Sequence, residues 1–283
     1  MDGATTQWDW KIIRAGEFRL DGGSMFGIIP KALWSRWAGA DEANRVRLQT
    51  NCLLLEDGAG HLVLIETGYG NKFDAKNRSI FALEDRWIGP ALAEVGIDCA
   101  SITDVVLTHL HFDHAGGLTH LMADSSEAVP TFPNATIHCQ RREWEDALAN
   151  RSTMSKTYLR DHLDPVTDQM KFIEGEGEPV PGIVVMPAPG HTWGQQAVMF
   201  QDAQGQVVFA GDVMPTANHV GLPANMGYDM EPYTNMCTKR DLLARAAAEG
   251  WRLVLDHEPG SAVVRVECVD GVQGGYRLIP ATG

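Results

Sequence analysis

The stretch Thr108-His109-Leu110-His111-Phe112-Asp113-His114 follows directly on the apolar run Val105-Val106-Leu107. It places four metal-capable side chains within six residues, at the end of a segment with the β-branched character of a buried strand. A lone histidine on an apolar face is usually a core residue, but three histidines and an aspartate this close together are typical of metal ligands. The stretch therefore predicts a metal site at the end of a strand.

Three further potential ligands, His191, Asp212 and His257, each follow another short apolar run, at residues 183–186, 207–209 and 253–255. Strand ends in layered α/β folds deliver side chains to a common edge, so we expect these residues to converge with the first group. Imidazole and carboxylate ligands suit zinc, iron, manganese or cobalt. We therefore expect two divalent ions, with zinc as the first choice, and hydrolytic chemistry. The remaining histidines are interpreted as core residues: His61, His120, His138, His162 and His219.

The rest of the chain alternates strand and helix patterns. Two hairpins are predicted, one from residues 52–55 and 62–65, the other from residues 197–200 and 207–210. Helices are predicted over residues 84–95, 141–149 and 239–248, the last with a capping box at Thr238 and Asp241 and a left-handed Gly250 after its end. This order favours a layered α/β fold in which helices cover the sheets.

No linker divides the chain, so a single domain over residues 1–283 is predicted. Residues 152–182, rich in charge, Gly and Pro, are interpreted as a structureless insertion near the site or as a solvated surface excursion. The tail, residues 261–283, resembles two short strands around residues 269–271.

Composition excludes several partners. The 37 acidic and 23 basic residues give a formal charge of -14, which disfavours nucleic acids and anionic membranes. The five cysteines are widely separated and include no Cys-x-x-Cys pair, so we expect free thiols. No secretory or bilayer-spanning pattern is found, which favours the cytoplasm.

The run His109-x-His111-x-Asp113-His114, with His191, Asp212 and His257 after it, resembles the metallo-β-lactamase superfamily over roughly residues 50–260. The resemblance implies a four-layer αββα sandwich. It further implies that His109, His111 and His191 hold the first ion, that Asp113, His114 and His257 hold the second, and that Asp212 bridges them. No ligand position is missing.

The implied mechanism is attack by a bridging hydroxide on a carbonyl or phosphoryl centre, with Asp113 moving the water proton. Thr108 and Glu66 lie where the superfamily keeps residues that orient ligands, although Glu66-Thr67-Gly68 departs from the commoner Asp-Thr-Gly. Tyr228 is a candidate to hydrogen-bond the carbonyl or leaving oxygen.

Residues 20–27 resemble the subgroup of N-acyl-homoserine lactone lactonases and methyl-parathion-type hydrolases. Met25, Phe26 and Trp34 are therefore candidates for an apolar wall that receives an acyl chain or aryl ring; the alternative is that they pack a core edge. Trp193 follows the ligand His191 at a position where lactonases often have Pro. The stretch 214–233, which includes Met214, His219 and Tyr228, is expected near the pocket mouth.

The predicted function is hydrolysis of a neutral, apolar small-molecule ester, first of all a lactone, with aryl esters or phosphotriesters second. Less favoured alternatives are a glutathione thioester hydrolase, a β-lactamase and a phosphodiesterase. A metal-stabilised structural protein is also conceivable, but seven ligands over two ions leave open positions. Trp8, Trp10 and Trp34 make a homodimer possible.

Overall fold

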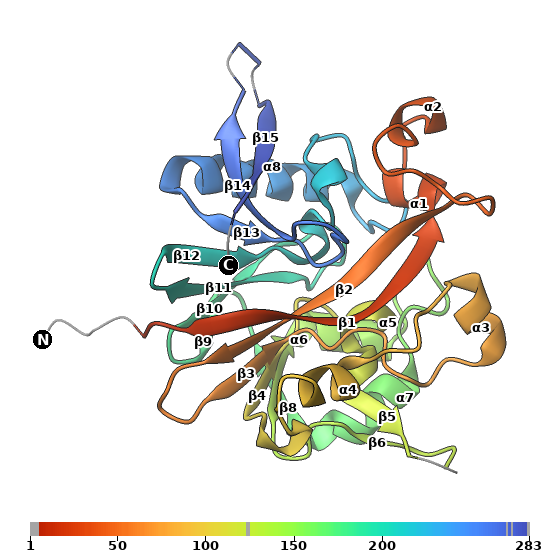
Figure 1. Ribbon diagram of the computed structural model, residues 1–283, viewed down its shortest axis with the longest axis vertical. Coiled ribbons are helices and arrows are strands. Elements are labelled where there is room, and N and C mark those ends of the chain that lie inside the picture. Colours follow the sequence, from red (N-terminus) through yellow and green to blue (C-terminus); the bar gives the residue numbers. More distant parts are fainter. Residues whose placement is uncertain (1–5, 123–124, 270, 273, 282–283) are drawn as a thin grey trace, which may run out of the picture.

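The computed structural model describes residues 6–122, 125–269, 271–272 and 274–281. Within these ranges a six-stranded and a seven-stranded sheet lie face to face, with helices on both outer faces (Figure 1). The six-stranded sheet has the order β1 (Asp9–Asp21), β2 (Arg45–Glu56), β3 (Leu62–Ile65), β4 (Asp104–Val106), β7 (Thr136–Gln140), β8 (Met170–Ile173). The seven-stranded sheet has the order β15 (Tyr276–Pro280), β14 (Val263–Cys268), β13 (Arg252–Val254), β12 (Gly205–Phe209), β11 (Gln196–Asp202), β10 (Ile183–Pro187), β9 (Gly177–Val180).

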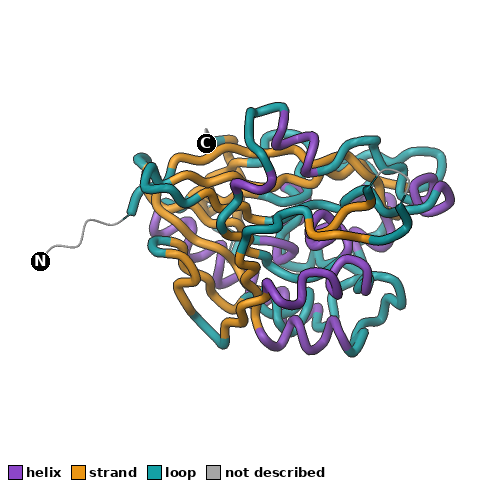
Figure 2. The backbone as a smooth tube through the Cα atoms, turned by 90° about the horizontal axis from the view of Figure 1, so that it is seen from below, coloured by secondary structure: helices purple, strands orange, loops and turns teal. Residues whose placement is uncertain are grey.

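The other elements are short, apart from one helix. The helices are α1 (Gly22–Phe26), α2 (Lys31–Trp34), α3 (Ala75–Ile80), α4 (Ile88–Ala93), α5 (Phe112–Ala115), α6 (Arg141–Leu148), α7 (Arg160–Leu163) and α8 (Pro232–Glu249). The 3-10 segments are η1 (Cys99–Ser101), η2 (Gly116–Leu118), η3 (Asp164–Gln169), η4 (Gly211–Val213) and η5 (Ala217–His219). A small hairpin pairs β5 (Thr119–Leu121) with β6 (Ala128–Pro130). Figure 2 shows helices running along the outside of the strands.

The layers follow from the alternation of buried side chains along each strand. In β2, Leu53 and Leu55 pack in the cluster between the sheets, where Phe209 of the opposite sheet also lies. Leu54, which points the other way, packs with Leu92 of α4 on the outer face. A third cluster places α8 over the outer face of the seven-stranded sheet through Leu242, Leu243 and Ala246. The predicted αββα sandwich is therefore confirmed.

Both predicted hairpins are present, as antiparallel pairs of β2 with β3 and of β11 with β12. The helix predicted over residues 141–149 is α6, and the tail forms the antiparallel pair β14 and β15. The helix predicted over residues 84–95 is shorter, because Trp87 has extended backbone and only α4 is helical. The capping box is wrong: α8 begins at Pro232, so Thr238 lies inside it and donates its hydroxyl to the carbonyl of Pro189. Gly250 ends α8 with a left-handed φ of 71°.

Residues 152–182 are not structureless, which corrects the prediction. They contain α7, η3 and the edge strands β8 and β9, one in each sheet. Of this segment, residues 154–157 line the cavity that opens beside the predicted metal ligands. The Gly and Pro content therefore marks turns between short elements rather than one long loop.

The strand directions bring the ligand-bearing segments to one edge. β4 runs parallel to β3, and β12 runs parallel to β13, so the carboxyl ends of each pair share an edge. β10 also has the direction of β12, because both are antiparallel to β11. All five cysteines are free. Among the described residues no helix is both long and apolar enough to cross a bilayer.

Candidate metal centre

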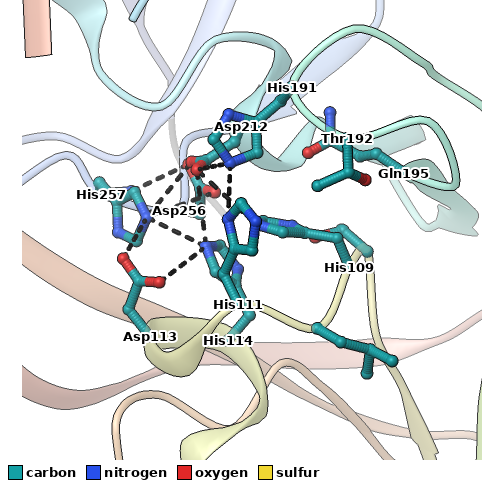
Figure 3. Close-up of polar contacts among 12 residues, drawn as sticks. His109, His111, Asp113, His114, His191, Thr192, Gln195, Asp212, Asp256 and His257 are labelled. Carbon is teal, nitrogen blue, oxygen red and sulfur yellow. Dashed lines mark hydrogen bonds and ion pairs between the residues drawn. The ribbon is translucent and has the colours of Figure 1, made fainter. Parts of the chain in front are cut away.

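All seven predicted ligands lie together at the shared edge of the two sheets (Figure 3). The turn after β4 and the start of α5 carry His109, His111, Asp113 and His114. The seven-stranded sheet supplies the other three: His191 follows β10, Asp212 lies in η4 after β12, and His257 follows β13. Short apolar strands thus end in ligands on both sheets, as the sequence predicted.

The first cluster consists of His109, His111, His191 and Asp212, whose ligand atoms all lie within 4.8 Å of one another. Nε2 of His191 lies 3.0 Å from Oδ2 of Asp212 and 2.9 Å from Nδ1 of His111. Nε2 of His109 lies 3.8 Å from the same Asp212 oxygen. Three imidazoles around one carboxylate form an N₃O donor set.

The second cluster consists of His114, Asp212, Asp256 and His257, again within 4.8 Å. Nε2 of His257 lies 3.2 Å from Nε2 of His114 and 3.3 Å from Oδ1 of Asp212. Asp113 lies at the margin, with its carboxylate oxygens 3.6 Å from His257 Nε2 and 3.8 Å from His114 Nε2. Asp212 is common to both clusters, which is the position that a bridging ligand requires.

Unpartnered atoms show that these residues fit divalent cations. Nε2 of His109 and Oδ1 of Asp212 are fully buried and have no hydrogen-bond partner among the described residues. Burying such groups unpaired costs free energy, so a native protein keeps them only where something binds them. Neutral imidazole nitrogens and carboxylate oxygens are the ligands that zinc and similar ions prefer.

The pKa shifts within the clusters also fit the binding of divalent cations. Burial, reinforced by the neighbouring histidines, holds the pKa of His109 well below its usual range, so the ring is a neutral ligand. Burial opposes charge on His191, but the facing carboxylates of Asp212 and Asp229 raise its pKa to about 10. Burial would raise the pKa of Asp212, yet the imidazoles of His191 and His257 hold it well below its usual range. Protons and metal ions compete for these lone pairs, so metal binding is expected to release protons.

Glu66 and Thr108 orient ligands. Glu66 accepts the backbone N–H of Thr108 at 2.7 Å through Oε1, and its Oε2 lies 3.2 Å from Nδ1 of His114. The Thr108 hydroxyl lies 3.0 Å from Nδ1 of His109, and Nδ1 of His257 donates to the carbonyl of Gln49 at 2.9 Å. These bonds leave Nε2 of each of the three rings facing the clusters. The longer side chain of Glu66 therefore reaches one ligand directly.

Asp229 is a supporting residue that the sequence analysis missed. Its Oδ1 accepts Nδ1–H of His191 at 2.9 Å, and its Oδ2 accepts from Asn235 at 3.0 Å and from the backbone of Met226 at 3.1 Å. The carboxylate fixes the tautomer and orientation of His191. It lies in the stretch 214–233 that was assigned to the pocket mouth, but nothing local identified its partner.

Glu143 is a second missed residue, on the buried face of α6. Its Oε1 accepts the backbone N–H of Leu110 at 3.0 Å and the hydroxyl of Tyr158 at 3.1 Å, and its Oε2 accepts the hydroxyl of Thr192 at 2.6 Å. Leu110 stands between two ligands and Thr192 follows a third, so Glu143 joins two ligand loops. The available signal was an acidic residue at the apolar stripe of a helix, four residues before the buried Ala147.

Asp256 is the third missed residue. It is buried directly before His257, and burial raises its pKa to about 8. The dipeptide Asp-His occurs here, at residues 113–114 and at residues 161–162. Because the last pair lies in neither cluster, the dipeptide alone did not identify Asp256.

Close backbone packing positions the His191 loop. Gly190 has a φ of +137°, and a Cβ atom there would lie 2.3 Å from the backbone N and Cα of Asn235 in α8. Only glycine permits both this conformation and this approach. The loop is therefore held against α8 just before its ligand.

A cavity of about 300 Å³ opens beside the clusters. Its walls are mainly apolar and include Leu20, Met25, Phe81, Phe112 and Met226. Tyr228 and residues 154–157 also line it. His111, Asp113, His191, Asp212 and His257 line its floor. A bound molecule with an apolar tail would therefore meet the metal ligands at one end of the cavity.

Of the residues predicted for the pocket, Met25 and Tyr228 line this cavity. Five others do not: Phe26, Trp34, Trp193, Met214 and His219. Phe26 stacks on Trp34 at 5.4 Å between ring centroids, so both rings fill the core under α1. Met214 is buried beneath α8, and the ring of Trp193 lies under the guanidinium of Arg142.

His219 does not line the cavity but supports Met25, a residue of its wall. Its Nε2 donates to the carbonyl of Met25 at 2.8 Å, Nδ1 lies 2.8 Å from the hydroxyl of Thr216, and its ring stacks on Phe26 at 4.8 Å. Burial lowers its pKa to about 4, so the ring is neutral. His219 is thus a core histidine that fixes the backbone of a wall residue.

The family model of the metallo-beta-lactamase superfamily matches residues 45–257, which include every ligand described above. The chain therefore belongs to the metallo-beta-lactamase superfamily. An N-acyl homoserine lactonase of Bacillus thuringiensis is 31% identical over an alignment of 179 positions, which covers 58% of this chain and 64% of the relative. The match thus spans less than two thirds of the length of that curated relative.

Two solved structures extend the comparison. A probable metal-dependent hydrolase from Staphylococcus aureus is 26% identical, with a TM-score of 0.86 over 99% of this chain and 100% of the other. AidC, a dizinc quorum-quenching lactonase solved in complex with a product, is 18% identical, with a TM-score of 0.79 over 99% of this chain and 96% of that one. The second likeness concerns the fold alone.

Proposed function

We propose that this protein is a dinuclear metal-dependent hydrolase of neutral, apolar esters, and that its substrate is a lactone of the N-acyl-homoserine lactone type. The observation that carries the proposal is the placement of Asp212, which belongs to both clusters at the floor of an apolar cavity. The lactonase relative supports the substrate class. The formal charge of -14 favours a neutral substrate over an anionic one.

The ligands divide between two ions. His109, His111 and His191 would hold the first, Asp113, His114 and His257 the second, and Asp212 both. Zinc is the preferred ion, ahead of iron, manganese and cobalt. When bound, such ions supply a water nucleophile active near neutral pH and polarise the ester carbonyl.

The side chains at the floor move protons and position the substrate. Asp113 lines the cavity, where its carboxylate can take the proton of the attacking water and return it to the leaving oxygen. Burial raises the pKa of Tyr228, so at neutral pH its phenol remains a hydrogen-bond donor to the carbonyl or leaving oxygen. Leu20, Met25 and Met226 form the wall that receives the acyl chain.

Aryl esters and phosphotriesters are the second candidate. The rings of Phe81 and Phe112 stack at 5.2 Å between centroids and both line the cavity. A flat aryl leaving group fits such a wall as well as an acyl chain does. Both reactions use the same floor residues.

Proton release tests the proposal, because opening a lactone yields a carboxylic acid that ionises. Chelator-stripped protein is mixed with a long-chain acyl-homoserine lactone before and after two equivalents of zinc are added. We expect turnover only with zinc, and none from Asp212→Ala, whose circular dichroism should match wild type. Turnover by Asp212→Ala with unchanged metal content would refute the shared ligand. A zinc-loaded wild type that leaves the lactone intact but cleaves aryl esters would establish the second candidate instead.

A further inference from the structure

The carboxylate of Asp256 belongs to the second cluster but is not among the seven residues assigned to the two ions. The side chain is 2% exposed, and its Oδ1 accepts the backbone N–H of His257 at 3.0 Å. Its Oδ2 is fully buried and has no hydrogen-bond partner among the described residues. A buried carboxylate oxygen without a donor is costly unless a cation faces it.

The orientation of Asp256 directs this oxygen into the second cluster. Oδ2 lies 3.9 Å from Nε2 of His257, and one carboxylate oxygen lies within 4.8 Å of the ligand atoms of His114, Asp212 and His257 (Figure 3). The bond from the His257 N–H fixes the rotamer of the carboxylate. Asp256 therefore lies within this cluster, and its distance of 3.9 Å to Nε2 of His257 is only slightly longer than the 3.6 Å of Asp113.

We propose that Asp256 is a fifth protein ligand of the second ion, beside Asp113, His114, Asp212 and His257. This inference rests on the dinuclear centre of the proposed function. With Asp256 included, the second position has three carboxylates and two imidazoles, whereas the first has three imidazoles and one shared carboxylate. Oxygen-rich sites of high coordination number suit harder ions such as Mn²⁺, while the imidazole-rich first position suits zinc.

Another role for Asp256 makes a different prediction. A protonated Asp256 that donates a hydrogen bond to Asp212 would only position that residue. Asp256→Asn keeps the size of the side chain and the ability to donate to Asp212, but removes the ionisable ligand. The variant therefore separates a ligand from a hydrogen-bond donor.

The test uses chelator-stripped protein loaded with one equivalent of Zn²⁺ and titrated with Mn²⁺, whose free form is followed by electron paramagnetic resonance. We expect one Mn²⁺ per wild-type chain and ~10–100-fold weaker Mn²⁺ binding in Asp256→Asn. The matched control is Asp104→Asn, which changes a carboxylate that pairs with His138 at 2.7 Å near the amino end of β4 and should bind Mn²⁺ like wild type. Mn²⁺ affinity within about twofold of wild type in Asp256→Asn would overturn the proposal.

Thermal unfolding separates metal binding from folding. Without metal, Asp256→Asn should be at least as stable as wild type, because it removes a buried unpaired carboxylate. With Mn²⁺ the order should reverse. A variant destabilised equally in both states would show a structural role and overturn the proposal. A wild-type chain that binds no second ion would instead refute the dinuclear centre of the proposed function.

Discussion

Replacing Glu143 tests whether one buried carboxylate holds two ligand loops together. Glu143→Ala removes the acceptor for Leu110, Tyr158 and Thr192 and leaves three donors in a buried site. Hydrogen bonds to a charged group contribute about 1.5–3 kcal/mol each, and not additively, so we expect a loss of about 4 kcal/mol in the free energy of unfolding. For a chain of this size that lowers the melting temperature by about 8 °C.

Glu143→Gln should cost far less. The amide oxygen still accepts from Leu110 and Tyr158, and the Thr192 hydroxyl can rotate to accept from the new amide group. We expect a loss of about 1 kcal/mol, because only the contribution of the charge disappears. Glu145→Ala, on the exposed face of the same helix, is the matched control and should unfold like wild type within about 1 °C.

Calorimetry of the metal-free variants measures these differences without a contribution from metal binding. A second measurement, zinc affinity by chelator competition, should fall in Glu143→Ala, since the loops that carry His109, His111 and His191 lose their common anchor. The reasoning fails if metal-free Glu143→Ala melts within about 2 °C of wild type. It fails equally if Glu143→Gln is as destabilised as Glu143→Ala, because the number of hydrogen bonds would then not matter.

Three further predictions concern the surroundings of the centre. Asp229→Asn should weaken zinc binding ~10–100-fold in chelator competition, and unchanged affinity would show that His191 needs no carboxylate partner. Because the pKa of His219 is about 4 when folded and near 6.5 when unfolded, acid favours the unfolded chain. The stability that neutral His219 contributes is complete above pH 6.5 and falls by about 3 kcal/mol towards pH 4. In urea unfolding of the metal-free protein, the free energy of unfolding should therefore depend less on pH in His219→Gln than in wild type. Identical pH dependences would contradict this. Gly190→Ala should destabilise the chain much more than Gly205→Ala, which also has a positive φ of 116° but nothing within 4 Å of the new Cβ. Equal melting temperatures would mean that contact with Asn235 is unimportant.

The ligands and the fold could be predicted because their signals are local. Each ligand-bearing segment follows a run of apolar strand residues, and the spacing from His109 to His114 is set by one turn and the start of one short helix. Along β2, Leu54 faces the outer helices while Leu53 and Leu55 face the other sheet, and this alternation defines the layers. Because such patterns span only a few residues, they can be recognised from the sequence without knowledge of the fold.

Glu143 and Asp229 were not predicted as supporting residues, because their partners are distant in sequence and no family pattern pointed to them. Glu143 meets Thr192 across 49 residues, and Asp229 meets His191 across 38. The prediction of the pocket wall was wrong for a related reason. Phe26 and Trp34 have the apolar character expected of a wall, but their rings stack on each other in the core. Hydrophobicity alone does not say which face of a short helix meets the cavity.

The division of the ligands between the two sheets has a mechanical consequence. His109 to His114 belong to the six-stranded sheet, whereas His191, Asp212 and His257 belong to the seven-stranded sheet. Metal binding would therefore act as a reversible cross-link between two halves of the sandwich, in addition to the apolar core and the hydrogen bonds that already join them. At an ion concentration of a hundred times Kd, each site would add about 2.7 kcal/mol against their separation. The supply of metal in the surroundings would then set the lifetime of the folded chain as well as its activity.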